Sequence, residues 1–187
     1  MALNAYLSLT GTQQGKIEGS ATQKGREGKI IVIAAEHAVT SPRDAASGQA
    51  TGRRQHRPFV ITKEIDRSSP LLYEAWVNDE SLSTWELQFW APATGGTTAA
   101  GKEVMRYTVR LSNAVICDIR FHMLNNKNPE LMRFAEYEEV SFVYQKIEWI
   151  WVPGGITASD EVQAQRSAPA KRKPAAKSKG RATRKKP

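Results

Sequence analysis

A polar segment of eighteen residues, Ser41 to Pro58, separates two strand-like runs, Lys29 to His37 and Phe59 to Ile65. Apart from the prolines at its ends, its only apolar side chains are alanines. Connections of this length are uncommon inside a compact domain and are usually functional or disordered. Because the segment mixes arginines with Asp44, has no low-complexity repeat and leads directly into a strand, we expect an ordered arm that reaches across a surface, such as that of a neighbouring copy. A solvated hairpin loop is the alternative.

Apolar residues alternate with polar ones through much of residues 1–158, a pattern that predicts β-strands. The β-branched run Lys29 to His37 is typical of a strand covered on both sides. The runs at 104–111 and 115–123 are either one long bent strand or a pair. Strands are expected at Tyr6 to Leu9, Lys16 to Ser20, Lys29 to His37, Phe59 to Ile65, Thr84 to Phe89, Val104 to Leu111, Val115 to Met123 and Glu136 to Trp151.

One helix is predicted, at about residues 69–79, with Ser69 as N-cap and Pro70 at the first helical position. Its apolar stripe includes Leu72 and Ala75. A single helix beside seven to nine strands favours a β-barrel or a β-sandwich. The tryptophans are expected to pack in the core or at interfaces; they are Trp76, Trp85, Trp90, Trp149 and Trp151.

The net charge of +8 comes from one end of the chain. Ten of the 27 Lys and Arg residues, but only two of the 19 Asp and Glu residues, lie from Ser159 onward, which leaves 17 of each sign in residues 1–158. Any argument from charge about nucleic-acid binding therefore applies to the tail alone.

The sequence predicts no catalytic, metal or cofactor site. The single Cys117 excludes an intrachain disulfide, and no zinc-ligand spacing occurs among the histidines, which are His37, His56 and His122. No signal peptide opens the chain, and no apolar run is long enough for a membrane span, so we expect a cytoplasmic protein with no membrane insertion.

Two patterns resemble catalytic motifs without their chemistry. The segment from Gly96 to Lys102 fits the GxxxxGK phosphate loop, but Glu103 stands where a magnesium-binding hydroxyl is required, so we interpret it as a hairpin connection. The carboxylates of Glu64 with Asp66, and of Glu136 with Glu138 and Glu139, are expected at solvated or salt-bridged strand edges.

Five sequence runs resemble the haemolysin-coregulated protein (Hcp) family, the tube proteins of bacterial type VI secretion systems. They are KGREG (24–28), SPRDAASGQATGRRQHRP (41–58), ITKEIDRSSPLL (61–72), NNKNPE (125–130) and EYEEVSFVYQKIEWIW followed by GGITA (136–158).

The resemblance covers residues 1–158 and implies a compact β-barrel of two sheets with one flanking helix. It also implies homohexameric rings that stack into an inner tube, which a contractile sheath expels together with a spike. Such proteins leave the cell without a cleavable signal and can carry small effectors in the lumen.

The arm and this resemblance lead to one prediction about contacts. A closed ring needs heterologous contacts, in which one patch meets a different patch on the next copy. We expect the arm to lie in the contact between subunits or between rings through its polar side chains, which are Ser41, Arg43, Asp44, Arg53, Arg54 and His56.

Residues 159–187 are predicted to be a disordered tail rich in Lys, Arg, Ala and Pro. It is either a solvated extension or a salt-sensitive binder of polyanions such as nucleic acid. In the second case the chain could be a ring-forming nucleic-acid-binding protein. The basic residues expected to bind are Lys171, Arg172, Lys173, Lys177, Lys179, Arg181, Arg184, Lys185 and Lys186.

Overall fold

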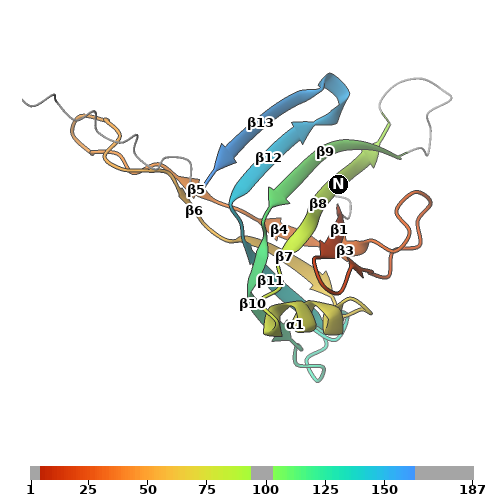
Figure 1. The fold of residues 1–187 in the computed structure, drawn as a ribbon. Helices are drawn as coiled ribbons and strands as arrows, with labels where there is room; N and C mark the ends of the chain where they lie inside the picture. The colour runs from red at the N-terminus through yellow and green to blue at the C-terminus, as the bar shows by residue number, and fades with distance from the viewer. Residues whose placement is uncertain (1–4, 94–102, 163–187) are drawn as a thin grey trace, which may run out of the picture.

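The computed structural model of the chain describes residues 5–93 and 103–162, which form two main β-sheets and one α-helix (Figure 1). The larger sheet has seven antiparallel strands in the order β13-β12-β9-β8-β1-β2, with β3 paired to β1. Their bounds are β1 (Ala5–Gly11), β2 (Lys16–Ile17), β3 (Ile30–Val32), β8 (Leu82–Pro92), β9 (Glu103–Ser112), β12 (Lys146–Trp151) and β13 (Ile156–Glu161).

The smaller sheet has four antiparallel strands in the order β10-β11-β7-β4. They are β4 (Ala34–Glu36), β7 (Phe59–Glu64), β10 (Val115–His122) and β11 (Tyr137–Val143). A separate two-stranded ladder, formed by β5 (Val39–Thr40) and β6 (Gln55–His56), lies at the root of the predicted arm. A short 3-10 helix, η1 (Val152–Gly154), connects β12 to β13.

The two sheets enclose an aromatic core. Trp85 of β8 makes edge-to-face contacts with Phe59 of β7, at 4.9 Å between ring centroids, and with Phe142 of β11, at 5.5 Å. These three rings come from both sheets, so their contacts join the sheets across the core. The prediction that Trp85 packs in the core is confirmed, since it is 1% exposed.

The helix α1 (Ser69–Val77) covers one end of the sheets and buries Leu72 and Ala75 (Figure 1). It begins one residue earlier than predicted: Ser68 is the N-cap, and Ser69 is the first helical residue. The hydroxyl of Ser69 is used in a buried cluster, described below. The helix ends at Val77, two residues before the predicted limit, because Asp79 adopts a positive φ of 47°.

Two predicted strands are each divided between the sheets. The run Lys29 to His37 forms β3 in the larger sheet and β4 in the smaller one, and all of β4 is exposed, so the prediction of a strand covered on both sides is wrong. The chain crosses between the sheets at Ile33, whose N–H donates to the carbonyl of Thr62 at 2.9 Å.

The predicted strand Glu136 to Trp151 is divided in the same way. It forms β11 and β12, and the chain changes sheets at Tyr144 and Gln145. This crossing explains why both faces of the run carry apolar residues: the face toward the core differs between the two halves. The runs at 104–111 and 115–123 form a pair of strands, β9 and β10, in different sheets.

The mainly β fold with two sheets and one helix is confirmed, but the strands of residues 5–93 and 103–162 do not close into a barrel. β13 and β2 end the larger sheet, and β10 and β4 end the smaller one. The sheets meet at two corners, one at Ile33 and the other where the Leu82 N–H donates to the carbonyl of Ala114 at 2.8 Å. β13 also places residues 159–161, expected in the tail, within the folded sheet.

Candidate functional site

The segment from Ser41 to Arg54 projects away from both sheets as a long hairpin (Figure 1). Its two sides are held together along their length: Arg43 and Ala50 form an isolated antiparallel bridge, and the Thr51 N–H donates to the carbonyl of Pro42 at 3.0 Å. Because these bonds lie within the segment, the arm has a defined shape without support from the body.

The tip of the arm is shaped by Asp44. Its carboxylate accepts hydrogen bonds from the N–H groups of Ala46, at 3.1 Å, and Ser47, at 2.7 Å, and from the Ser47 hydroxyl at 2.8 Å. The Ser47 hydroxyl and these amides lower the pKa of Asp44. Arg43 donates to the carbonyl of Gly48 at 3.0 Å, and Gly48 supplies the positive φ of 68° that the turn requires.

Side chains along the arm are exposed from Ser41 to Gln55, except for Pro42, which is half-buried. Such a segment buries little surface, so its extension into solvent adds little to the stability of the single chain.

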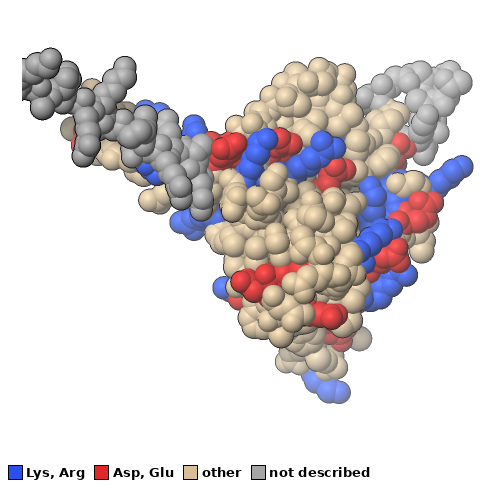
Figure 2. Space-filling model, in the orientation of Figure 1, with Lys and Arg blue, Asp and Glu red and all other residues tan. Residues whose placement is uncertain are grey.

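The surface of the body carries charges of both signs. Lys and Arg side chains are interleaved with Asp and Glu side chains on the face that Figure 2 shows, in keeping with the neutral balance of residues 1–158.

The root of the arm is fastened to the body through β13 and Tyr144. Arg54 donates to Asp160 at 2.7 Å, and the buried His56 ring lies 3.1 Å from the same carboxylate and 3.0 Å from the Tyr144 hydroxyl. The Arg57 N–H donates to the carbonyl of Ala38 at 2.9 Å. These contacts fix the direction in which the arm leaves the sheets.

The predicted contact residues therefore have different roles. Arg43 and Asp44 shape the tip, Arg54 and His56 attach the root, and Ser41 and Arg53 are exposed. Whether they also contact a neighbouring copy stays a prediction. The predicted tail residues from Lys171 to Lys186 and the segment Gly96 to Lys102 lie outside the described residues.

Sequence reasoning missed the partners of the root. Asp160 falls in residues 159–187, which the sequence predicts to be a tail, and Tyr144 falls in the predicted strand Glu136 to Trp151. No local pattern could have found them, because Tyr144 and Asp160 are 88 and 104 positions away from His56 in the sequence.

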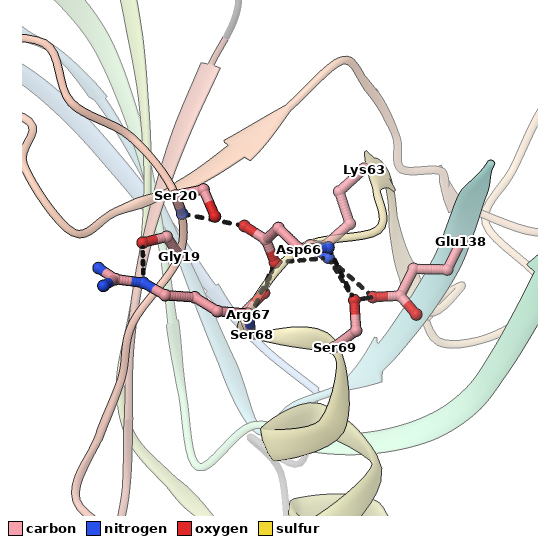
Figure 3. Close-up of polar contacts among 8 residues, drawn as sticks. All are labelled: Gly19, Ser20, Lys63, Asp66, Arg67, Ser68, Ser69 and Glu138. Atoms are coloured by element: carbon pink, nitrogen blue, oxygen red, sulfur yellow. Dashed lines mark hydrogen bonds and ion pairs between the residues drawn. The ribbon is translucent and has the colours of Figure 1, made fainter. Parts of the chain in front are cut away.

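A buried polar cluster joins helix α1 to strands β7 and β11 (Figure 3). The Lys63 ammonium on β7 lies 2.8 Å from the Glu138 carboxylate on β11, and both side chains are fully buried. Ser69 accepts a hydrogen bond from Lys63 at 3.0 Å and donates one to Glu138 at 2.9 Å. The expectation that Glu138 lies at a strand edge is wrong, because β11 is an inner strand and this residue points toward the core side.

Asp66 extends the cluster toward the loop before β3 (Figure 3). Its carboxylate lies 3.0 Å from the Lys63 ammonium and accepts a hydrogen bond from the Ser20 N–H at 3.0 Å. Burial acts to raise the pKa of Asp66, but hydrogen bonds from Ser68 and the charge of Lys63 outweigh it and lower that pKa. Arg67 donates to the carbonyl of Gly19 at 2.6 Å. The centre of the cluster, at Lys63, Ser69 and Glu138, is buried, and Glu138 Oε2 has no hydrogen-bonding partner among the described residues. The other contacts tie the start of α1 to β7 and β11.

Many large apolar side chains of the described residues are exposed. They include Val77 at 74%, Met132 at 66% and Ile156 at 66%. The whole of β4 is exposed as well, although it lies at the edge of the smaller sheet. An unpaired strand edge such as that of β4 is a surface on which another chain can pair.

Within residues 5–93 and 103–162, no helix combines the length and the apolar character needed to cross a membrane. Over the same ranges, no three His, Cys, Asp or Glu side chains come together in an arrangement that could hold a metal ion.

The chain is similar to known proteins over most of its length. Residues 6–151 match the family described as "Type VI secretion system effector, Hcp". The chain is 40% identical over 170 residues to the "Major exported protein" of Pseudomonas aeruginosa, and the match covers 86% of this chain and 96% of that protein.

Solved structures agree with this match. The Hcp1 protein of E. coli EAEC 042 is 34% identical with a TM-score of 0.73, over 86% of this chain and 99% of that one. The secreted protein Hcp3 of Pseudomonas aeruginosa is 32% identical with a TM-score of 0.66, over 84% of this chain and 97% of that one. The family resemblance seen in the sequence is therefore confirmed, and the chain belongs to the Hcp family of type VI secretion system proteins.

Proposed function

We propose that this protein is the subunit of the type VI secretion tube: six copies form a ring with a central lumen, and rings stack into the inner tube that the machine expels. The observation that carries the proposal is the arm, which is ordered by its own hydrogen bonds yet exposed from Ser41 to Gln55 apart from the half-buried Pro42. Membership of the Hcp family supports the same function.

Ring closure requires two different surfaces on each copy, and the arm supplies one of them. Its root is attached to the body by Arg54 and His56, so it is presented in one direction to the next copy. The exposed apolar side chains and the exposed strand β4 are candidates for the receiving surface. In this arrangement the apolar surface left open in the single chain is buried in the assembly.

The proposal includes partners outside the ring. The protein is made in the cytoplasm, contacts the contractile sheath and the spike, carries small effectors in its lumen, and leaves the cell without a cleavable signal. The description of its Pseudomonas aeruginosa relative as a major exported protein supports this route.

Native mass spectrometry of the full-length protein, with negative-stain electron microscopy of the same sample, tests the proposal. We expect six times the chain mass and ring-shaped particles that stack at high concentration. A protein that stays monomeric at every concentration tested would refute assignment as a self-assembling tube subunit.

The role of the arm is tested by replacing Ser41 to Arg54 with Asn-Gly. This two-residue turn suits the antiparallel ladder of Thr40 with Gln55 that remains. We expect a folded monomer. The matched control, Lys127→Ser with Arg133→Ser, removes the same net charge of two elsewhere on the surface and should leave rings intact. Rings and tubes formed by the shortened protein would show that the arm is not the contact.

A second function is favoured by the charge distribution. Ten basic residues and no acidic ones lie in residues 166–187, next to a neutral body. We propose that the tail binds polyanions such as nucleic acid. Binding of a fluorescent oligonucleotide should weaken steeply with salt and vanish on truncation after Glu161. Affinity that is independent of salt, or that survives truncation, would contradict this function.

A further inference from the structure

The arm joins the body through two short connections, and each carries a histidine. His37 follows β4 on the way into the arm, and His56 ends β6 on the way out. The Tyr144 hydroxyl lies between them, 2.5 Å from His37 Nε2 and 3.0 Å from His56 Nδ1. His56 Nε2 lies 3.1 Å from Asp160. We refer to His37, Tyr144, His56 and Asp160 as the root clasp.

The chemistry of the four groups fixes the direction of their hydrogen bonds. An ionised carboxylate only accepts, so His56 Nε2 carries a proton and donates to Asp160. In the neutral His56 ring Nδ1 is then an acceptor, and Tyr144 donates to it. The Tyr144 oxygen is left to accept from His37 Nε2. With both histidines neutral, each of the three hydrogen bonds has one donor and one acceptor.

A single added proton can be accommodated. If His56 is charged, its Nδ1–H donates to the Tyr144 oxygen, Tyr144 donates to His37 Nε2, and the His37 proton moves to Nδ1. The chain of bonds reverses direction and every contact is kept. The positive ring also pairs with Asp160, which already accepts from Arg54.

A second proton cannot be accommodated in the same way. With both rings charged, both nitrogens facing Tyr144 are donors, so its oxygen accepts twice and its own O–H loses its partner. Burial, and the charge of Asp160, raise the pKa of Tyr144 to about 12, so loss of that proton offers no relief at neutral or acid pH. The two charged rings would also repel each other, with centroids 6.1 Å apart.

The surroundings of His37 reinforce this limit. Phe59 stacks on its ring at 5.2 Å, and Trp149 lies at 6.4 Å. Burial, followed by the charge of His56, lowers the pKa of His37. The hollow beside it, about 290 Å³, is lined by charged groups of both signs from β4, β10 and the outgoing connection, and these are Glu36, Arg57, Asp118 and Arg120.

We propose that the root clasp is a proton-operated hinge. It holds the arm in one orientation while at most one of its two histidines is charged, and it loosens the arm at its root when both are charged. The same groups that attach the arm thus make its direction dependent on pH.

The sign follows from proton binding. A histidine whose pKa is lowered in the folded state binds fewer protons there than in the unfolded chain. The contribution of His37 to the stability of the fold is complete above the ordinary histidine pKa of 6.5 and is lost as pH falls below that value. Loosening is therefore expected on the acid side, between pH 6.5 and the lower pKa of His37.

Hydrogen exchange of the full-length protein, measured by mass spectrometry between pH 8 and 5 and corrected for the intrinsic pH dependence, tests the hinge. Peptides that cover residues 38–40, 55–57 and 159–162 should exchange about fivefold to tenfold faster at pH 5, the factor expected for losing one or two hydrogen bonds. The Tyr144→Phe variant should show the faster exchange already at pH 8, because its ring keeps the packing and lacks the hydroxyl.

Two further variants separate the clasp from other histidines. His56→Gln keeps a donor for Asp160 but cannot take up a proton, so its exchange should depend less on pH than that of the wild type. His122→Gln, at a histidine stacked on Tyr137, should keep the wild-type dependence. Wild-type exchange that is constant with pH, or a dependence abolished by His122→Gln, would overturn the hinge. The exchange is read at the root itself, so this result is distinguishable from failure to form rings.

Discussion

Lys63→Met tests whether the buried cluster at the start of α1 stabilises the fold. The substitution keeps an unbranched side chain of similar length and removes the ammonium. Three contacts are lost, to Glu138 at 2.8 Å, to Asp66 at 3.0 Å and to Ser69 at 3.0 Å. The fully buried Glu138 carboxylate then keeps one of the hydrogen bonds of the cluster, the one from the Ser69 hydroxyl.

The expected loss is large because the remaining charge stays buried. Removing one partner of a buried ion pair costs about 3–5 kcal/mol, mostly as the penalty for the charge left behind. The double variant Lys63→Met with Glu138→Leu removes that charge too, so its loss of stability should be smaller than that of the single variant. An exposed ion pair provides the comparison. Arg120→Met removes the pair between Arg120 and Asp118 and should lower the free energy of unfolding by less than about 1 kcal/mol.

Urea denaturation at pH 7.5 measures these losses, with tryptophan fluorescence as the probe because Trp85 lies in the core. All variants are compared at one protein concentration, since assembly stabilises the folded state by mass action. Equal slopes against urea are required for the free energies to be compared. A loss below about 1 kcal/mol for Lys63→Met, or a double variant that is less stable than the single one, would refute the reasoning.

Three further predictions concern the core, a close contact and acid stability. Trp85→Ala should lower the free energy of unfolding by about 3–5 kcal/mol, because it leaves a cavity between the sheets, and urea denaturation followed by circular dichroism measures this loss. Gly19→Ala should cost about 1–3 kcal/mol, since its Cβ would lie 2.4 Å from the Ile30 Cα, whereas Gly52→Ala, with 3.5 Å to the nearest atom, should unfold like the wild type. Because the pKa of Asp66 is lowered in the folded protein, the ionised carboxylate stabilises the fold fully above its ordinary pKa of 3.8. This stabilisation is lost as pH falls through the pKa of Asp66 in the folded protein. The melting temperature of Asp66→Asn should therefore fall less than that of the wild type over the same acid range.

Local pattern in the sequence determined much of the fold. Alternation at Trp85 and Leu87 places β8, and a serine followed by Pro70 places the start of α1 to within one residue. The polar composition of residues 41–58 marks the arm, and its motifs identify the family. These properties depend on neighbours a few residues apart, so the sequence alone was sufficient for them.

Only the tertiary structure decided which sheet each strand joins and which polar side chains meet. Alternation gives the face of a residue but not its sheet, so the crossings at Ile33 and Tyr144 could not be seen in advance. Lys63 and Glu138 are 75 positions apart, and His37 and Tyr144 are 107 apart. Such pairs are set by strand register across the fold, because a shift of one residue turns every side chain to the other face. For the same reason, the arm was predictable as a segment, while its attachment required the folded chain.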